Sequence, residues 1–180
     1  MSERRRRRGE HVLRRAATAR EPQGMRVLLA AGAIAPLAAG RVAAAVARGL
    51  RQGGLAAPES FELPAEHDGA QLRGLLTQES FDSRLHLARA LVIATPEASA
   101  RSLAGGALFE LATRARQAGV PAYAIAGRCS LEAFDARVLD LQLVLEAADA
   151  RSLALAGRRL SAVMCEAADT TSAGSPGTRK

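Results

Sequence analysis

The sequence has few aromatic residues and a single lysine, and both shortages limit what the chain can do. Phe, Trp and Tyr make up 3% of the 180 residues and Trp is absent, whereas hydrophobic residues make up 48%. A core is therefore built mainly from Ala, Leu and Val. The one lysine is Lys180, so the body offers no lysine for a phosphate-binding or Schiff-base mechanism.

Cysteines and long apolar runs are also scarce. Cys129 and Cys165 fit no CxxC spacing, so we expect no disulfide framework, as suits a reducing compartment. No apolar run approaches the roughly 20 residues that a membrane-spanning helix needs. The residues that follow the N-terminal arginines are polar and basic, unlike the apolar stretch of a secretory signal. We therefore expect a cytoplasmic protein without a membrane partner.

Most of the excess positive charge lies near the N-terminus. The net charge of the chain is +7, and residues 1–24 contain eight Arg and three Glu, which leaves residues 25–165 nearly neutral. We expect residues 1–24 to be a disordered arm that would bind nucleic acid through phosphate contacts. The candidate contacts are Arg4, Arg5, Arg6, Arg7 and Arg8. No aromatic residue lies among them for base stacking. Two alternatives to nucleic-acid binding also explain the run: a solvated tail, or a true start of the protein at Met25.

Apolar runs alternate with stretches of helical periodicity. Short continuous runs are typical of strands buried on both faces of a parallel sheet. The expected strands are 26–31, 60–63, 90–94, 122–126 and 139–145, and the expected helices are 37–50, 70–76, 103–118 and 150–165. This order predicts one α/β domain over residues 25–166, an open, Rossmann-like sheet of four to five mostly parallel strands with helices on both faces. Residues 167–180, rich in Thr, Ser and Gly, are expected to be disordered.

Three stretches follow one another in an informative order. Arg26–Leu50 forms the first strand–helix unit, Leu63–Gly69 is a glycine-containing acidic segment, and Phe81–Gly127 contains Ser102-Leu103-Ala104-Gly105 and Ala115–Gly127. In this order they resemble the glycerate kinase family. The similarity covers residues 26–165 and is interrupted between Gly69 and Phe81, where the family carries a long middle section with a second domain.

The resemblance implies ATP-dependent phosphorylation of glycerate or a related small organic acid, with ATP and Mg²⁺. The family's first loop reads Asp-Ser-Phe-Lys-Gly, but residues 31–35 here are Ala-Gly-Ala-Ile-Ala. Its second loop, Asp-Gly-Gly-Glu-Gly-Thr, is reduced to Asp68-Gly69, and its third, Gly-Glu-Gly-Arg, is replaced by residues 95–100. Gly106 stands in the following segment where the family often has Lys.

These departures remove groups that phosphoryl transfer needs, namely cations or Mg²⁺ at the phosphates and carboxylates that hold the metal. We therefore expect a weak or inactive remnant of a kinase. The alternative is a non-catalytic α/β domain that binds a small anion or a partner protein. A homodimer would cover an apolar face left by the missing middle domain, and a second protein would supply the missing half in trans.

The candidate ligand-binding residues each have a second interpretation. They are Gly32, Asp68, Gly69, Thr95, Gly127 and Arg128. Gly127-Arg128 follows a strand at a place where anions bind in open α/β sheets, or is an ordinary turn with a surface arginine, which we favour. Asp68, with Glu66 or His67, would hold a metal, but no second cluster supports this, so we expect no metal and favour a turn at Asp68-Gly69.

Thr95 also has two interpretations. It belongs to a remnant ligand loop, or it caps a helix, with Pro96 at the first helical position and Glu97 in the first turn. The helix-cap interpretation accounts for all three residues, and we favour it.

Overall fold

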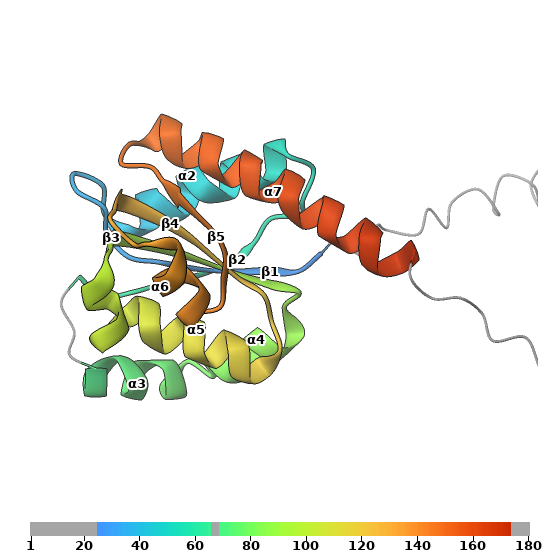
Figure 1. Cartoon of the computed structure of the whole chain (residues 1–180). Helices are drawn as coiled ribbons and strands as arrows, with labels where there is room; N and C mark the ends of the chain where they lie inside the picture. The colour runs from blue at the N-terminus through green and yellow to red at the C-terminus, as the bar shows by residue number, and fades with distance from the viewer. Residues whose placement is uncertain (1–24, 66–68, 174–180) are drawn as a thin grey trace, which may run out of the picture.

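The computed structural model describes residues 25–65 and 69–173, with side chains up to residue 167. A parallel five-stranded sheet in the order β2-β1-β3-β4-β5 forms its centre, and helices cover both faces (Figure 1). The strands are β1 (Val27–Ala31), β2 (Glu59–Glu62), β3 (Ala90–Ala98), β4 (Ala122–Cys129) and β5 (Leu141–Glu146). The expected open α/β fold is therefore confirmed.

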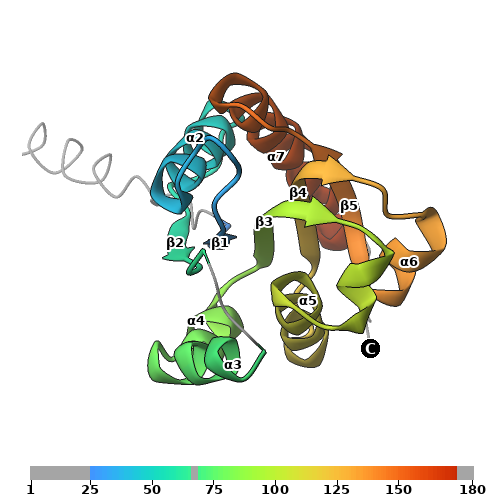
Figure 2. The same ribbon diagram turned by 90° about the vertical axis from the view of Figure 1, so that its left-hand side faces the viewer.

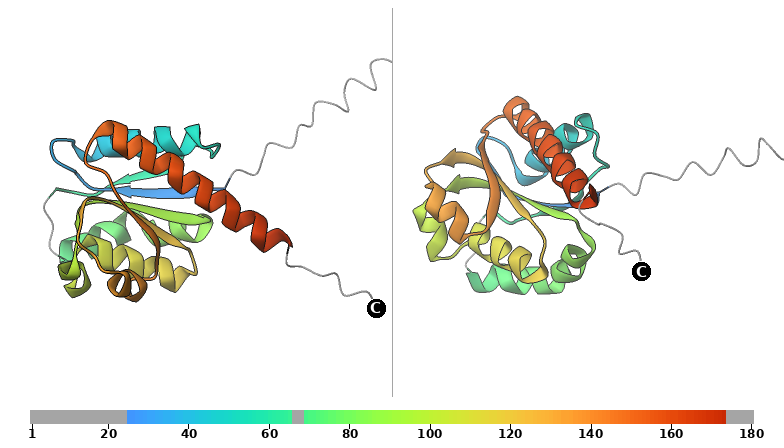
Figure 3. Two further views of the ribbon diagram at one scale, coloured as in Figure 1. Left: turned by 45° about the horizontal axis from the view of Figure 1, so that its top comes forward. Right: turned by 45° about the vertical axis from the view of Figure 1, so that its right-hand side comes forward.

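The helices form two layers. They are α2 (Ala39–Gln52), α3 (Gly69–Gln78), α4 (Phe81–Leu87), the short 3₁₀ helix η1 (Ala100–Ala104), α5 (Ala107–Ala118), α6 (Ala133–Val138) and α7 (Ala150–Ala173). Helices α2 and α7 lie side by side on one face of the sheet, and α3, α4 and α5 cover the other (Figure 2). Figure 3 shows that the C-terminal part of α7 runs on past the sheet.

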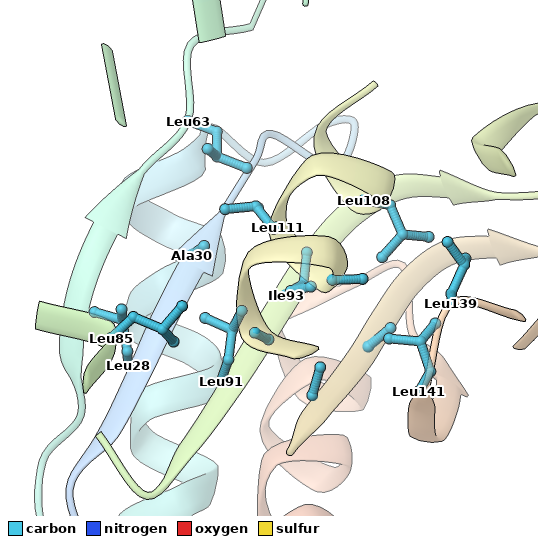
Figure 4. Packing of buried hydrophobic residues seen from close by; sticks show 14 of the residues in the cluster. Leu28, Ala30, Leu63, Leu85, Leu91, Ile93, Leu108, Leu111, Leu139 and Leu141 are labelled. Carbon is cyan, nitrogen blue, oxygen red and sulfur yellow. The ribbon is translucent and has the colours of Figure 1, made fainter. Parts of the chain in front are cut away.

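The core consists of two apolar layers, one on each side of the sheet. Leu91 and Ile93 of β3 face the α5 layer, and Val92 and Ala94 face the layer of α2 and α7. Strand side chains alternate between faces, so a strand covered on both sides is apolar throughout. Figure 4 shows the α5 layer, in which Leu108 and Leu111 pack over the sheet.

Several boundaries differ from those expected. Residues 95–97 continue β3, so the interpretation of Thr95 as the start of a helix is wrong. Gly127 and Arg128 lie within β4, so they do not form a turn that opens a helix. Strands β3 and β4 extend past the ends of the neighbouring strands because they continue to pair with each other there. In this extension Glu97 lies opposite Arg128 and Ala98 lies opposite Cys129.

The helices also differ in places. The expected helix over 103–118 is broken at Gly105 and Gly106, whose φ values of 125° and 95° are incompatible with a helix. The sequence pattern did not indicate α4 or α6, which are short. Residues 167–173 continue α7, so the expectation of disorder is wrong for them. In the described part of the chain, no helix is both long and apolar enough to cross a bilayer.

Candidate functional site

The carboxyl ends of β1 and β3 mark the place where a ligand is expected in this topology. The chain proceeds from β1 outward to β2 on one side, whereas β3 continues to β4 on the other. Adjacent loops therefore diverge beyond the ends of β1 and β3, and such a switch point is the usual ligand crevice of an open α/β sheet.

In this protein the switch point is filled by its own chain. The loop after β1 folds back on itself, with reciprocal backbone hydrogen bonds of 3.0 and 2.7 Å between Ile34 and Leu37. Ile34 is 2% exposed and packs over Gly127, where an added Cβ would lie 2.8 Å from Ile34 Cγ2 and 2.8 Å from the Pro96 carbonyl oxygen. An apolar plug thus occupies the crevice.

Two glycines predicted to bind ligand take part in this packing. Gly32 is buried, and its N–H donates a 2.8 Å hydrogen bond to the carbonyl oxygen of Ala94. Gly127 provides the space that Ile34 fills. The structure therefore gives both glycines a role in packing.

Beside the plug lies an open hollow of about 270 Å³, formed by the end of β3, helix η1 and the beginning of α5. Thr95 lines it because it follows Leu91 and Ile93 on the α5 face of β3. The other polar lining residues are Glu97, Ser99, Arg101 and Ser102. Of the predicted site residues that the structure describes, Thr95 is thus the one that lines this hollow.

Hydrogen bonds hold the wall of the hollow in place. The Thr95 hydroxyl donates to the carbonyl oxygen of Glu97 at 3.2 Å. The Ser99 N–H donates to Ser102 Oγ at 3.2 Å, and the Ser102 N–H donates to the Ser99 carbonyl at 2.8 Å. These two bonds close the turn at the start of η1 and hold the segment that carries Arg101.

The beginning of α5 forms another wall. Gly105 and Gly106 have positive φ, which side-chain-bearing residues rarely adopt. Gly106 is the N-cap and has no side chain to accept a hydrogen bond from the first turn. The first N–H groups of a helix have no partner within the helix, and together with the helix dipole they favour an anion.

Two arginines lie at this edge, and they differ in their partners. Arg128, a predicted anion contact, donates to Glu97 at 3.5 Å across the β3–β4 ladder. Arg101 is exposed and has no carboxylate within 4.0 Å among the described residues. Arg101 is therefore the cation available to a ligand in the hollow.

The described residues of this edge do not fit ATP with Mg²⁺. Magnesium is held by carboxylates together with phosphate oxygens, and the one carboxylate that lines the hollow, Glu97, is paired with Arg128. Glu62 lies instead against Gly40 in the first turn of α2. The hollow is also below the 300–1,000 Å³ usual for drug-sized ligands. No group of three or more metal-ligating side chains occurs in the described segments.

Some predicted residues lie elsewhere. Asp68, with Glu66 and His67, falls outside the described residues, as do the arginines of residues 1–24. Gly69 begins α3 and does not line the hollow. Sequence reasoning missed Ser99 and Arg101, although the Ser-x-x-Ser spacing and the Gly105-Gly106 pair signal a capped turn and a new helix start.

A larger hollow of about 500 Å³ lies between α4 and α5, around Arg114. The Arg114 guanidinium donates to Asp82 at 2.6 Å and to Glu110 at 2.9 Å. Burial alone would lower the pKa of Arg114, but the bonds to the two carboxylates outweigh burial and raise it. Because its cation is already neutralised, this hollow is a weaker candidate for an anion site.

Comparison of the chain with models of known protein families and with curated proteins gives no match. The resemblance to glycerate kinases therefore rests on the sequence segments described above.

Proposed function

We propose that this domain is a glycerate-kinase-like protein that binds a small organic anion and transfers phosphate weakly or not at all. The observation that carries the proposal is the polar hollow at the beginning of α5. It combines Arg101, which has no carboxylate partner among the described residues, with the uncapped first turn of the helix. Guanidinium groups and helix N-termini are both suited to carboxylate and phosphate.

The size and chemistry of the hollow favour a small ligand. A volume of about 270 Å³ suits a three-carbon hydroxy acid or its phosphate ester better than a nucleotide. Ser99 and Ser102 line the hollow and offer hydroxyl groups, as recognition of a hydroxy acid would require. D-glycerate, which the resemblance suggests, is therefore the first ligand to test.

Loss of catalysis is supported by the residues at the switch point. The Ile34 side chain occupies the crevice next to the Pro96 backbone, and no lysine lies in residues 1–179. Stabilising a transferring phosphoryl group requires preorganised cations. Arg128 is drawn toward Glu97, which leaves Arg101 as the cation nearest to the hollow.

Isothermal titration of the full chain with D-glycerate, 3-phosphoglycerate and inorganic phosphate tests the binding proposal. We expect Arg101→Gln to weaken binding by about tenfold or more, since hydrogen bonds to charged groups contribute about 1.5–3 kcal/mol. Arg89→Gln is the matched control, because Arg89 is exposed and does not line the hollow. Equal affinities of the two variants, or no binding by a folded wild type, would reject the proposed site.

A coupled assay for ADP release, with ATP, Mg²⁺ and D-glycerate, tests the second half of the proposal. We expect turnover far below the roughly 1–100 s⁻¹ of ordinary kinases. Glycerate-dependent turnover within that range would show that family chemistry persists on other residues, and Asp68 would then be the first position to mutate.

A further inference from the structure

The face formed by α2 and α7 carries an excess of positive charge. Six arginines lie on it, whereas the acids within the two helices are Glu166 and Asp169, near the C-terminal end of α7. The arginines are Arg41, Arg48, Arg51, Arg151, Arg158 and Arg159. The remainder of residues 25–165 has nine Arg against thirteen Asp and Glu. The nearly neutral body is thus strongly divided, with a basic face and an acidic remainder.

The two helices present these arginines on one surface. All six side chains are exposed, and the two helices cross in close contact, with Gly49 against Ala154 and Gly53 against Ser161 (Figures 1 and 3). Arg41 and Arg48 are seven residues apart, as are Arg151 and Arg158. At 1.5 Å per residue each pair spans about 10 Å along its helix, which gives one basic row on each helix.

These arginines are not neutralised within the described structure. None of the six has a carboxylate within 4.0 Å among the described residues, and Arg48 donates only to the Ala150 carbonyl oxygen at 3.4 Å. The carboxylate of nearby Asp149 accepts hydrogen bonds from the backbone N–H groups of Arg151 and Ser152. On the opposite face, by contrast, Arg84 and Arg114 are both ion-paired.

We propose that the α2–α7 face binds the phosphate backbone of double-stranded nucleic acid. Guanidinium groups match phosphate oxygens in a bidentate geometry, and two basic rows suit a rod that carries a charge about every 1.7 Å. A membrane surface fits less well, because Leu155 is the only large apolar side chain among the exposed residues that the structure describes on this face, and amphipathic membrane binding needs a broad apolar face.

The N-terminal segment carries further positive charge. Residues 1–24 carry eight further Arg and join the body at Met25, which packs against the core layer beneath α2 and α7. The face carries no aromatic residue for base stacking. The binding is therefore expected to depend on salt and not on base sequence.

Fluorescence anisotropy of the full chain with a labelled DNA duplex of about 20 base pairs tests the proposal. The face variant changes Arg48, Arg51, Arg158 and Arg159 to Gln, which removes four charges and keeps good helix formers. The control variant changes Arg73, Arg89, Arg116 and Arg137 to Gln, which alters the net charge equally, and all four are exposed and unpaired among the described residues.

The slope of log affinity against log salt distinguishes the two variants, because each phosphate contact contributes about 0.9 to it. We expect the face variant to reduce the slope by about two to four and to bind at least tenfold more weakly at low salt, while the control retains the wild-type slope. Circular dichroism confirms that both variants are folded.

Three outcomes would overturn the proposal. One is equal binding by the face and control variants. Another is loss of binding on changing Arg4–Arg8 to Gln when the face variant still binds like the wild type. The third is tighter association with vesicles of anionic lipid, or with polyglutamate, than with the duplex.

Discussion

A Cβ atom on Gly157 of α7 would lie 2.5 Å from the carbonyl oxygen of Val46 on α2. The two helix backbones therefore touch, and the contact requires glycine. Alanine favours a helix over glycine by about 1 kcal/mol, but here the neighbouring atoms are backbone and cannot rotate away. We expect Gly157→Ala to destabilise the protein by about 1–3 kcal/mol through overpacking, as measured by urea denaturation.

Gly74 provides the matched control, because it lies within α3 and an added Cβ meets no atom within 4 Å. Gly74→Ala should stabilise the protein by about 0.5–1 kcal/mol. If both substitutions stabilise the protein, the close approach of α2 and α7 is wrong.

Ile34 and Gly127 form a second packed pair, at the switch point of the sheet. Ile34→Ala should lower the free energy of unfolding by about 2–4 kcal/mol, because it leaves a cavity in place of a buried side chain. Gly127→Ala should also destabilise, since its Cβ would stand 2.8 Å from both Ile34 Cγ2 and the Pro96 carbonyl oxygen.

In the double variant, Ile34→Ala with Gly127→Ala, the new Cβ at position 127 no longer meets Ile34 Cγ2 but still meets the Pro96 carbonyl oxygen. The double variant should therefore be less destabilised than the sum of the single changes, in a double-mutant cycle by denaturation. Strict additivity would show that the two residues do not share a site. Leu155→Ala, at a side chain that is 65% exposed, is the control with little expected effect.

The central strands and main helices were predictable from apolar runs and helical spacing. Val27–Ala31, for instance, is buried throughout and has no polar residue to indicate any other environment. The ends of strands were less predictable, because Thr95 and Glu97 have local signals of a helix start, yet strand pairing with β4 decides their conformation. Propensity is a weak guide when a neighbouring strand can extend the ladder.

The candidate site was only partly predictable for a related reason. Thr95 lines the hollow, but Ser99 and Arg101 are placed beside it by the short helix η1, which ends at the turn of Gly105-Gly106. The sequence pattern indicated one helix over residues 103–118 and did not indicate η1. The plug at Ile34 depends on how a loop folds over a distant strand, and no local pattern records such a contact.

Arg84 connects α4 to the edge strand β2. Its Nε donates to Glu59 at 2.6 Å, a terminal nitrogen donates to the Ser60 carbonyl oxygen at 3.3 Å, and its guanidinium lies 5.5 Å from the centre of the Phe61 ring. A lysine cannot make these contacts together. Because the Glu59 side chain is 59% exposed, the ion pair itself contributes little, and we expect Arg84→Lys to cost about 1 kcal/mol in total.

Urea denaturation at low and high salt measures this cost. Because part of the loss is geometric and not purely ionic, the difference between wild type and Arg84→Lys should persist in about 1 M salt. Arg73→Lys, at an exposed arginine of α3, should change stability little. A difference that vanishes in high salt would contradict the packing contribution.

Asp149 makes the last helix pH-sensitive. Hydrogen bonds from the Ser152 N–H at 2.9 Å, from the Ser152 side chain, and from the Arg151 N–H at 2.8 Å lower the pKa of the Asp149 carboxyl. A lowered folded-state pKa means that the stabilisation is fully present above the unfolded-state pKa, near 4, and is lost as the pH falls through the folded value. The N-cap of α7 should therefore weaken in acid.

The measurement is the denaturation midpoint of wild type and Asp149→Asn from about pH 7 down to about pH 3. Asparagine also caps helices but does not titrate, so the wild type should be the more stable at neutral pH and the two should converge in acid. Asp140→Asn, at an exposed residue outside the helix, controls for loss of a carboxylate. A wild-type advantage that stays constant over the whole range would mean that the charged Asp149 carboxylate does not stabilise the start of α7.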